Sequence, residues 1–253
     1  MRERYAYELI QKGMRIDERK FDEFRPIKIR LGVSNKAEGS AEVTLGETKV
    51  IAGVKMKIGV PFPDTPNEGT LIVGAEFTPL ASPDFESGPP SEDAVELARV
   101  VDRGLRESHC IDLEKLCITP KEKVWSVFVD LHMINHQGNL LDACALAAIA
   151  ALRNSQMPKL EDDTVIRGDY TGKLPVVFTP VNVTVGKIGD KFLLDPLIEE
   201  ENILDSKLSI SIRDDEKICA LQKMGENGID FDSLEKMFDI AIKKSKELRE
   251  LVK

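Results

Sequence analysis

Apolar and polar positions alternate with a period of two through the first part of the chain. That period is typical of strands with one buried face, because successive side chains of a strand point to opposite sides. A stretch with four prolines at 79–90 then interrupts the pattern, since proline disrupts regular structure. The alternation predicts strands at 27–31, 41–45, 49–58 and 71–77.

The helical period appears first near the N-terminus, at 3–12, and returns after the prolines. Ser91 is a favourable N-cap, because its side chain can accept a hydrogen bond from an unpaired backbone N–H of the first turn. Glu92 and Asp93 follow it, and their negative charge complements the positive end of a helix dipole. We therefore expect a helix from Ser91 through about 108.

A further helix is predicted to lie at the centre of the fold. It follows a strongly β-like segment at 124–134, and Asn139 stands where its N-cap should be. Residues 140–152 are apolar and rich in alanine, and Asp142 carries their only charge. A helix that is apolar on all sides is expected to pack against several neighbours.

The second half of the chain repeats the order of strands followed by a helix. An amphipathic segment at 232–252 places its apolar residues along one stripe and predicts a C-terminal helix. Strands followed by a helix, twice over, indicate an α+β fold of layered sheets and helices. The expected strands of this half are 181–185, 192–194, 208–212 and 218–222.

The composition argues against a broad nucleic-acid-binding surface. The formal net charge is −9, whereas phosphate neutralisation by basic residues supplies most non-specific affinity for nucleic acids. Any RNA contact must therefore be local, or shared with a more basic partner. The four cysteines form no CxxC pair, and the longest apolar run, 143–152, is too short to span a bilayer. We expect a cytoplasmic protein without a membrane segment.

Two histidines have a spacing that is used by helical zinc sites. His132 and His136 are four residues apart, but the segment around them is predicted as a strand. Four residues of a strand span about 13 Å, which is too far for both rings to bind one ion. We therefore predict no metal site.

An acidic run follows one of the strands of the second half. Residues 199–201 are consecutive glutamates, and Asp205 lies close behind them. A run of like charges is usually a solvated loop, and this interpretation is preferred here to a carboxylate active site. Acid catalysis would need a second group at a defined distance, which the sequence does not supply.

Arg99, Arg103 and Arg106 are spaced so that a helix would present all three on one face. One interpretation is ion pairing at the surface. The other is a phosphate-binding row, because a guanidinium presents a fork of donors suited to phosphate oxygens. The spacing alone does not separate the two. The neighbouring carboxylates that could pair with the arginines are Glu96, Asp102 and Glu107.

Several motifs resemble those of RNase PH-like exosome subunits, in particular the non-catalytic ring subunit of the archaeal exosome. The likeness extends over almost the whole chain, and no single motif carries it. The motifs are GMRIDER at 13–19, RPI at 25–27, GSA at 39–41, LGETKV at 45–50, DTPNEG at 64–69, PP at 89–90, ELARVVDR at 96–103, LDAC at 141–144 and DP at 195–196.

The resemblance implies an α+β, RNase PH-like fold, similar to domain 2 of ribosomal protein S5, with two βαβα halves. It implies a single domain over 1–253, with halves at about 25–160 and 176–253. It also implies a trimer of heterodimers with a catalytic RNase PH-like subunit. That hexameric ring would degrade single-stranded RNA 3′-to-5′ by phosphorolysis, with RNA-binding cap subunits on one face and no cofactor.

The chain departs from active members of this family where they hold phosphate and RNA. An arginine pair of those relatives is replaced by Glu92 and Asp93, and another arginine is replaced by Leu140. The catalytic aspartates, six residues apart, align with Glu201 and Lys207. We therefore expect no catalytic residue here. An active phosphorolytic exoribonuclease is the first alternative.

Arg99 and Arg103 match positions that contact RNA in the resembling subunits, so the resemblance favours phosphate contact by both. The predicted function is a non-catalytic exosome component that helps to structure its partner's active site and contacts RNA. The other alternative is a scaffold that completes the ring without touching RNA.

Overall fold

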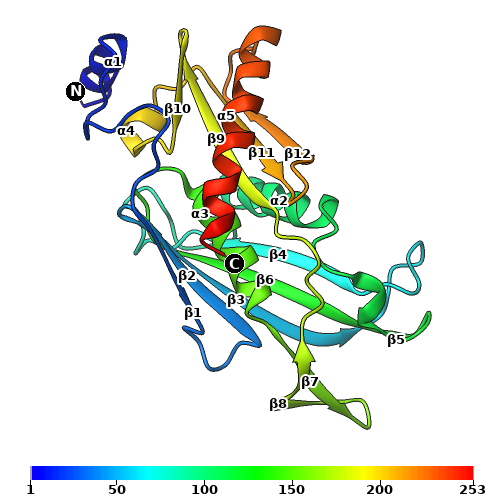
Figure 1. The fold of residues 1–253 in the computed structure, drawn as a ribbon. Helices are drawn as coiled ribbons and strands as arrows, with labels where there is room; N and C mark the ends of the chain where they lie inside the picture. The colour runs from blue at the N-terminus through cyan, green and yellow to red at the C-terminus, as the bar shows by residue number, and fades with distance from the viewer. Residues whose placement is uncertain (1, 253) are drawn as a thin grey trace.

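A six-stranded sheet forms the N-terminal half in the structure, a computed structural model that describes residues 2–252 (Figure 1). Its order is β1-β2-β3-β6-β4, with β5 also paired to β6. Strand β4 is parallel to β6, and the other neighbours are antiparallel. The strands are β1 (Ile27–Leu31), β2 (Gly39–Leu45), β3 (Thr48–Gly59), β4 (Thr70–Glu76), β5 (Cys117–Thr119) and β6 (Lys123–Asn135).

The alternating pattern determines which face of this sheet is covered. Val50, Ala52, Val54 and Met56 of β3 are buried, while the residues between them are partly exposed. Helix α3 (Leu140–Arg153) packs on β2 and β3, and α2 (Glu92–Glu107) packs on β4. The apolar face of the sheet therefore lies beneath these two helices.

A second sheet forms the C-terminal half, with the order β10-β9-β11-β12 and antiparallel neighbours throughout. Helix α5 (Phe231–Glu250) packs on β9 and β11. The predicted strands and C-terminal helix of this half are confirmed within a few residues. The strands are β9 (Val181–Ile188), β10 (Lys191–Leu194), β11 (Ser206–Ile212) and β12 (Ile218–Met224).

Helix α3 occupies the centre of the molecule, as its composition predicted. It contacts β2 and β3 of the first sheet and β9 of the second, so both sheets share one hydrophobic core (Figure 1). Twelve of its residues are buried, including Asp142. Its small side chains allow this close approach, because alanine permits tight packing on several sides.

Some elements were not predicted. Strands β7 (Gln156–Glu161) and β8 (Thr164–Lys173) form a hairpin that extends below the large sheet in Figure 1. Most of β8 is exposed, so its sequence lacks the alternation that a buried face imposes.

Helix α1 (Arg2–Gln11) agrees with the prediction. The remaining short elements are the 3₁₀-helix η1 (Leu113–Leu116) and α4 (Ile198–Glu201).

The two predicted N-caps differ in outcome. Ser91 caps α2 as expected, because its side chain accepts a hydrogen bond from Ala94 N at 3.2 Å. Asn139 stands at the start of α3 but makes no side-chain cap, and its φ of +53° is left-handed. Its Nδ2 donates instead to Asp142 Oδ2 at 3.0 Å and to Asp195 Oδ1 at 3.1 Å. Asn139 is therefore the N-cap residue as predicted, but its side chain does not cap: the two carboxylates hold its Nδ2, and its buried Oδ1 has no hydrogen-bond partner among the described residues.

Asp142 joins the two halves through hydrogen bonds inside the core. Its oxygens accept from Thr184 N and Oγ1, from Asn182 Nδ2 and from Asn139 Nδ2, at 2.8–3.0 Å. Burial raises the pKa of Asp142 to about 6, although these four donors favour the charged form. The carboxyl group therefore holds its proton more tightly in the folded protein than in the unfolded chain.

We expect Asp142→Asn to change how stability depends on pH. The wild type loses stability relative to the variant as pH rises from about 4 to about 6, by up to about 3 kcal/mol, because the raised pKa favours the protonated folded state. The measurement is the free energy of unfolding of both proteins across that range. Asp130→Asn on the exposed part of β6 is the control, and a constant difference between wild type and Asp142→Asn would contradict the expectation.

Candidate nucleic-acid interface

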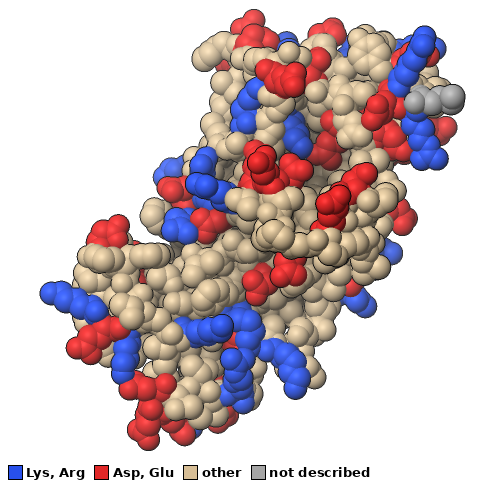
Figure 2. Space-filling model, turned by 180° about the vertical axis from the view of Figure 1, so that it is seen from behind, with Lys and Arg blue, Asp and Glu red and all other residues tan. Residues whose placement is uncertain are grey.

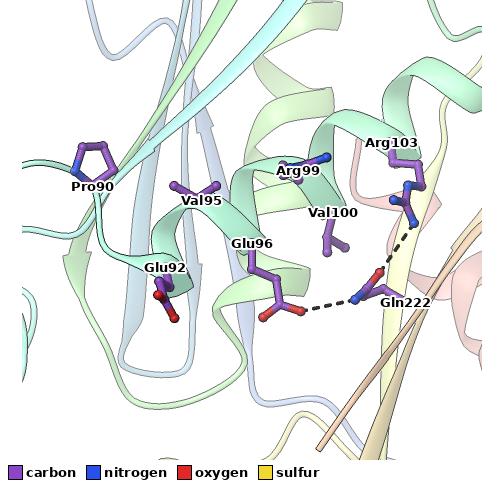
Figure 3. Close-up of a pocket in the computed structure, with 8 residues that line it drawn as sticks. All are labelled: Pro90, Glu92, Val95, Glu96, Arg99, Val100, Arg103 and Gln222. Atoms are coloured by element: carbon purple, nitrogen blue, oxygen red, sulfur yellow. Dashed lines mark hydrogen bonds between the residues drawn. The ribbon is translucent and has the colours of Figure 1, made fainter.

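A groove of about 420 Å³ lies on the outer side of α2, where this helix meets β12. We call it the arginine groove (Figure 3). Two arginines, two carboxylates and an amide lie beside an apolar surface made by a proline and two valines. Its lining residues are Pro90, Glu92, Val95, Glu96, Arg99, Val100, Arg103 and Gln222.

Arg99 and Arg103, which we call the arginine pair, are exposed and one helical turn apart on α2. Arg103 Nη1 donates to Gln222 Oε1 at 3.5 Å. Within residues 2–252, neither arginine forms an ion pair with a carboxylate. Both guanidinium groups are therefore available to an anion from outside the chain, because their charge is not neutralised.

Arg106 does not continue this pair, so the interpretation of the three arginines as one phosphate-binding row does not hold for it. It forms an ion pair with Asp102 at 2.9 Å, and its Nη2 also donates to Leu71 O at 3.1 Å. Arg106 and Glu107 line a different pocket, beside the loop that precedes β4. The ion-pair interpretation is therefore right for Arg106, because Asp102 lies one turn away with the favourable spacing of four residues.

A second pocket, of about 330 Å³, adjoins the arginine groove at Glu96, which lines both. We call it the α4 pocket. It brings together Asp93, Leu140, Glu201 and Lys207, the positions at which the family resemblance implied departures from active relatives. These residues come from α2, α3, α4 and β11, so only the folded chain places them side by side. The aromatic rings of Phe77, Phe85 and His136 also line it.

Glu201 and Lys207 of the α4 pocket neutralise each other. Lys207 Nζ lies 2.6 Å from Glu201 Oε1, and Glu201 Oε2 accepts from Asn139 N at 3.0 Å. Burial alone would raise the pKa of Glu201, but the charge and hydrogen bond of Lys207 hold it below its usual value. The carboxylate therefore stays ionised and paired, which is unsuited to a general acid.

The acidic run at 199–201 is not the solvated loop that its composition predicted. Glu200 is fully buried in α4, and its carboxylate binds the guanidinium of Arg15 at 2.5 and 3.0 Å. Glu199 pairs with Arg2 at 3.2 Å. The prediction fails because basic residues from the N-terminal segment lie against α4, far away in sequence but close in space.

A buried cluster around Asp195 positions the start of α3 and the approach to α4. Asp195 Oδ1 and Oδ2 accept from Arg25 Nη2 and Nε at 2.6 and 2.8 Å. Arg19 Nη1 and Asn139 Nδ2 donate to the same carboxylate at 3.1 Å. Arg25 and Asp195 belong to the RPI and DP motifs, but the sequence did not predict that these two residues bind each other.

The two histidines lie in different surroundings. His132 Nδ1 is 3.3 Å from Glu76 Oε2, whereas the ring of His136 stacks on Phe85 with centroids 5.5 Å apart. Burial lowers the pKa of His136. In the described part of the chain, no three His, Cys, Asp or Glu side chains are arranged to hold a metal ion. No helix between residues 2 and 252 is long and apolar enough to cross a membrane.

Charge on the molecular surface is mixed. Figure 2 shows one face, on which lysines and arginines form small groups among aspartates and glutamates instead of covering the surface. This distribution agrees with the net charge of −9. A broad nucleic-acid-binding surface is therefore disfavoured on this face, and any nucleic-acid contact there must be local.

Two models of the 3′ exoribonuclease (RNase PH) family match the chain, domain 1 over residues 23–158 and domain 2 over residues 179–244. The chain belongs to this family. The exosome complex component Rrp42 of Methanopyrus kandleri is 49% identical over 249 residues, which cover 96% of this chain and 92% of that protein. The Rrp42 component of Archaeoglobus fulgidus is also 49% identical, over 98% of this chain and 95% of the relative.

Solved structures agree with this assignment. A structure of the Archaeoglobus fulgidus exosome with RNA bound to the active site contains a chain that is 48% identical, with a TM-score of 0.94 over 100% of this chain and 98% of that one. A chain of an archaeal exosome core has 45% identity and a TM-score of 0.88, over 98% of this chain and 95% of that one. The RNase PH-like α+β fold that the resemblance implied is confirmed.

We expect Asp195→Asn to destabilise the protein by about 3–5 kcal/mol, because it leaves Arg25 and Arg19 buried or half-buried without their anion. Chemical denaturation of the purified variant measures the loss. Asp239→Asn, on the exposed side of α5, removes the same charge without breaking an ion pair and should change stability by less than about 0.5 kcal/mol. Equal stabilities of the two variants would contradict the structural role assigned to Asp195.

Proposed function

We propose that this chain is the non-catalytic ring subunit of an archaeal-type exosome. It pairs with a catalytic RNase PH-like subunit, and three such pairs form a hexameric ring in the cytoplasm. The ring degrades single-stranded RNA 3′-to-5′ by phosphorolysis, and RNA-binding cap subunits occupy one of its faces. This chain helps to structure its partner's active site and contacts RNA through Arg99 and Arg103. The similarity to Rrp42 components and to chains of archaeal exosome structures supports this assembly.

The ion pair between Glu201 and Lys207 carries the argument against catalysis. Phosphorolysis needs inorganic phosphate in line with the scissile bond, and an acid near the leaving oxygen. Here Glu201, at the first aligned position, forms an ion pair with Lys207. Lys207 itself occupies the second aligned position, where active relatives carry an aspartate. An acid or base group typically contributes roughly 10²–10⁴ in rate.

The remaining charges of the α4 pocket also oppose phosphate binding. Asp93 and Glu96 line it with Glu201, and Leu140 stands where active relatives carry an arginine. Since Lys207 is already neutralised, phosphate would meet uncompensated carboxylates. A preorganised charge at a reacting group is often worth about 10²–10³ in rate, and this pocket lacks it.

The arginine groove supports RNA contact. Its arginine pair is exposed, unneutralised and one helical turn apart. The valines beside it give an apolar surface that can contact a base or ribose. Guanidinium groups bind phosphate oxygens through forked donors, and phosphate contacts position a nucleic acid without reading its sequence. The groove therefore suits a backbone contact on single-stranded RNA.

The first test measures phosphate-dependent shortening of a single-stranded RNA from its 3′ end. It uses the purified chain alone and the chain with its catalytic partner. We expect no nucleoside diphosphate release from the chain alone, and rapid release from the pair. A chain whose Lys207 is replaced by Asp serves as a comparison, because it breaks the ion pair and restores the second acid of the aligned pattern. Shortening by the wild-type chain alone, surviving stringent purification, would make it an enzyme in its own right.

The second test replaces both Arg99 and Arg103 by Ala in the assembled ring. We expect RNA affinity to fall by about tenfold or more, and the slope of log K against log salt to shrink by about 1.4, because two phosphate contacts are lost. The matched control is the double variant Arg30→Ala and Arg167→Ala, which removes two exposed arginines outside the groove. Unchanged affinity and slope would instead favour a scaffold that never touches RNA.

A further inference from the structure

Gln222 lies between two opposite charges on the edge of the arginine groove. It comes from β12, in the C-terminal sheet, whereas both of its partners belong to α2. Its Nε2 donates to Glu96 Oε1 at 3.3 Å, and its Oε1 accepts from Arg103 Nη1 at 3.5 Å. Figure 3 shows the amide bridging the two side chains. A primary amide has both donors and an acceptor, so it satisfies an anion and a cation without adding charge.

The carboxylates nearest to the arginine pair on α2 are both occupied by other groups. Glu96 lies three residues before Arg99, and Asp102 lies three residues after it, and both spacings permit ion pairs on a helix. Asp102 is bound by Arg106 at 2.9 and 3.2 Å. Glu96 is engaged by Gln222. This arrangement explains why, within residues 2–252, the arginine pair keeps its full charge.

Glu107 does not change this picture. It lies four residues after Arg103, but it lines a different pocket at the C-terminal end of α2, next to the loop before β4. An arginine placed before a glutamate is also the weaker order for an ion pair on a helix. Glu92, the other carboxylate of the groove, lies seven residues before Arg99, beyond the spacing of three or four that permits an ion pair on a helix. Glu96 is therefore the carboxylate whose position decides the charge available in the arginine groove.

We propose that Gln222 is a positioning residue for RNA binding. It holds Glu96 away from the arginine pair and orients the guanidinium of Arg103 toward a phosphate of the bound strand. The inference rests on the proposed RNA contact of the arginine pair. A carboxylate that binds a guanidinium competes with phosphate for the same donors, so releasing Glu96 weakens RNA binding even though Gln222 itself need not touch RNA.

The chemistry at this position is narrow. A leucine would keep the size of the side chain but release both partners. A glutamate would bind Arg103 as an ion pair and repel Glu96, so it would neutralise one arginine directly. A lysine would pair with Glu96 and repel Arg103. The amide is the group that engages both charges while leaving the net charge of the groove unchanged.

The test uses Gln222→Leu in the full chain, assembled with its catalytic partner, and a labelled single-stranded oligoadenylate as the probe. We expect RNA affinity to fall by about three- to tenfold, and the salt slope to shrink by about 0.7, because one phosphate contact is lost. Gln222→Glu should lose more. Gln156→Leu is the matched control. Gln156 is an exposed glutamine on β7, which belongs to a different sheet from β12 and supplies no residue of the groove.

A double-mutant cycle separates positioning from packing. If Gln222 acts by restraining Glu96, the loss caused by Gln222→Leu should shrink in a chain that already carries Glu96→Gln, because no carboxylate remains to be released and only the orientation of Arg103 is lost. Direct contact between Gln222 and RNA, or a purely structural role, predicts the same loss in both backgrounds. That equal loss, or no loss in the single variant, would overturn the inference.

Failure of the Gln222 inference can be distinguished from failure of the proposed RNA contact. If the Arg99→Ala, Arg103→Ala double variant binds RNA as the wild type does, the proposed RNA contact is wrong and the inference falls with it. If that variant weakens binding while the 222/96 cycle shows no coupling, the RNA contact stands and only the role of Gln222 is wrong. Thermal unfolding of each variant confirms that the chains compared are folded.

Discussion

Asp195 is fully buried, and its carboxylate is held by groups from widely separated parts of the chain. A buried charge is tolerated only when it is paired and hydrogen-bonded, because desolvation of an isolated ion is too unfavourable. Arg19 and Arg25 therefore bind the N-terminal segment to the C-terminal half. Asn139, the residue just before α3, donates a hydrogen bond to the same carboxylate. The position of the central helix, and with it the wall that α3 gives to the α4 pocket, depends on this cluster.

The neighbouring ion pairs extend the same constraint to α4. Arg15 and Glu200 are both buried and bind each other through two hydrogen bonds. Because α4 is anchored in this way, Glu201 projects toward Lys207 and the start of α3. The acidic run that looked solvent-exposed in the sequence is thus a structural element of the α4 pocket.

The two pockets on either side of Glu96 have opposite chemical character. The α4 pocket keeps a cavity, but its lysine is neutralised and its other charges are acidic. The arginine groove keeps two unneutralised cations beside an apolar surface. Under the proposed function, this pair of features would let the subunit contribute binding without chemistry, since electrostatic contact with a strand needs only exposed positive charge, whereas phosphoryl transfer needs several groups in a defined geometry.

Elements with a strong hydrophobic period could be predicted from the sequence, and those without it could not. The alternation in β3 and the apolar composition of α3 led to correct strands, helices and an α+β class. The β7–β8 hairpin lacks a buried face, and α4 is short and acidic, so neither produced a signal. Among the residues of the arginine groove, Arg99 and Arg103 were candidates from their spacing together with the family resemblance, while Gln222, an isolated glutamine on an edge strand, gave no signal.

The sequence by itself determined which segments bury an apolar face and which family the motifs resemble. These properties are local, since they depend on the period of side chains and on the identity of single residues. The tertiary structure decided which charges meet: Arg15 with Glu200, Arg25 with Asp195, Glu201 with Lys207, and Glu96 with Gln222. Ion pairs and pockets join residues that are distant in the chain, and only the packing of both sheets around α3 brings them within hydrogen-bonding distance.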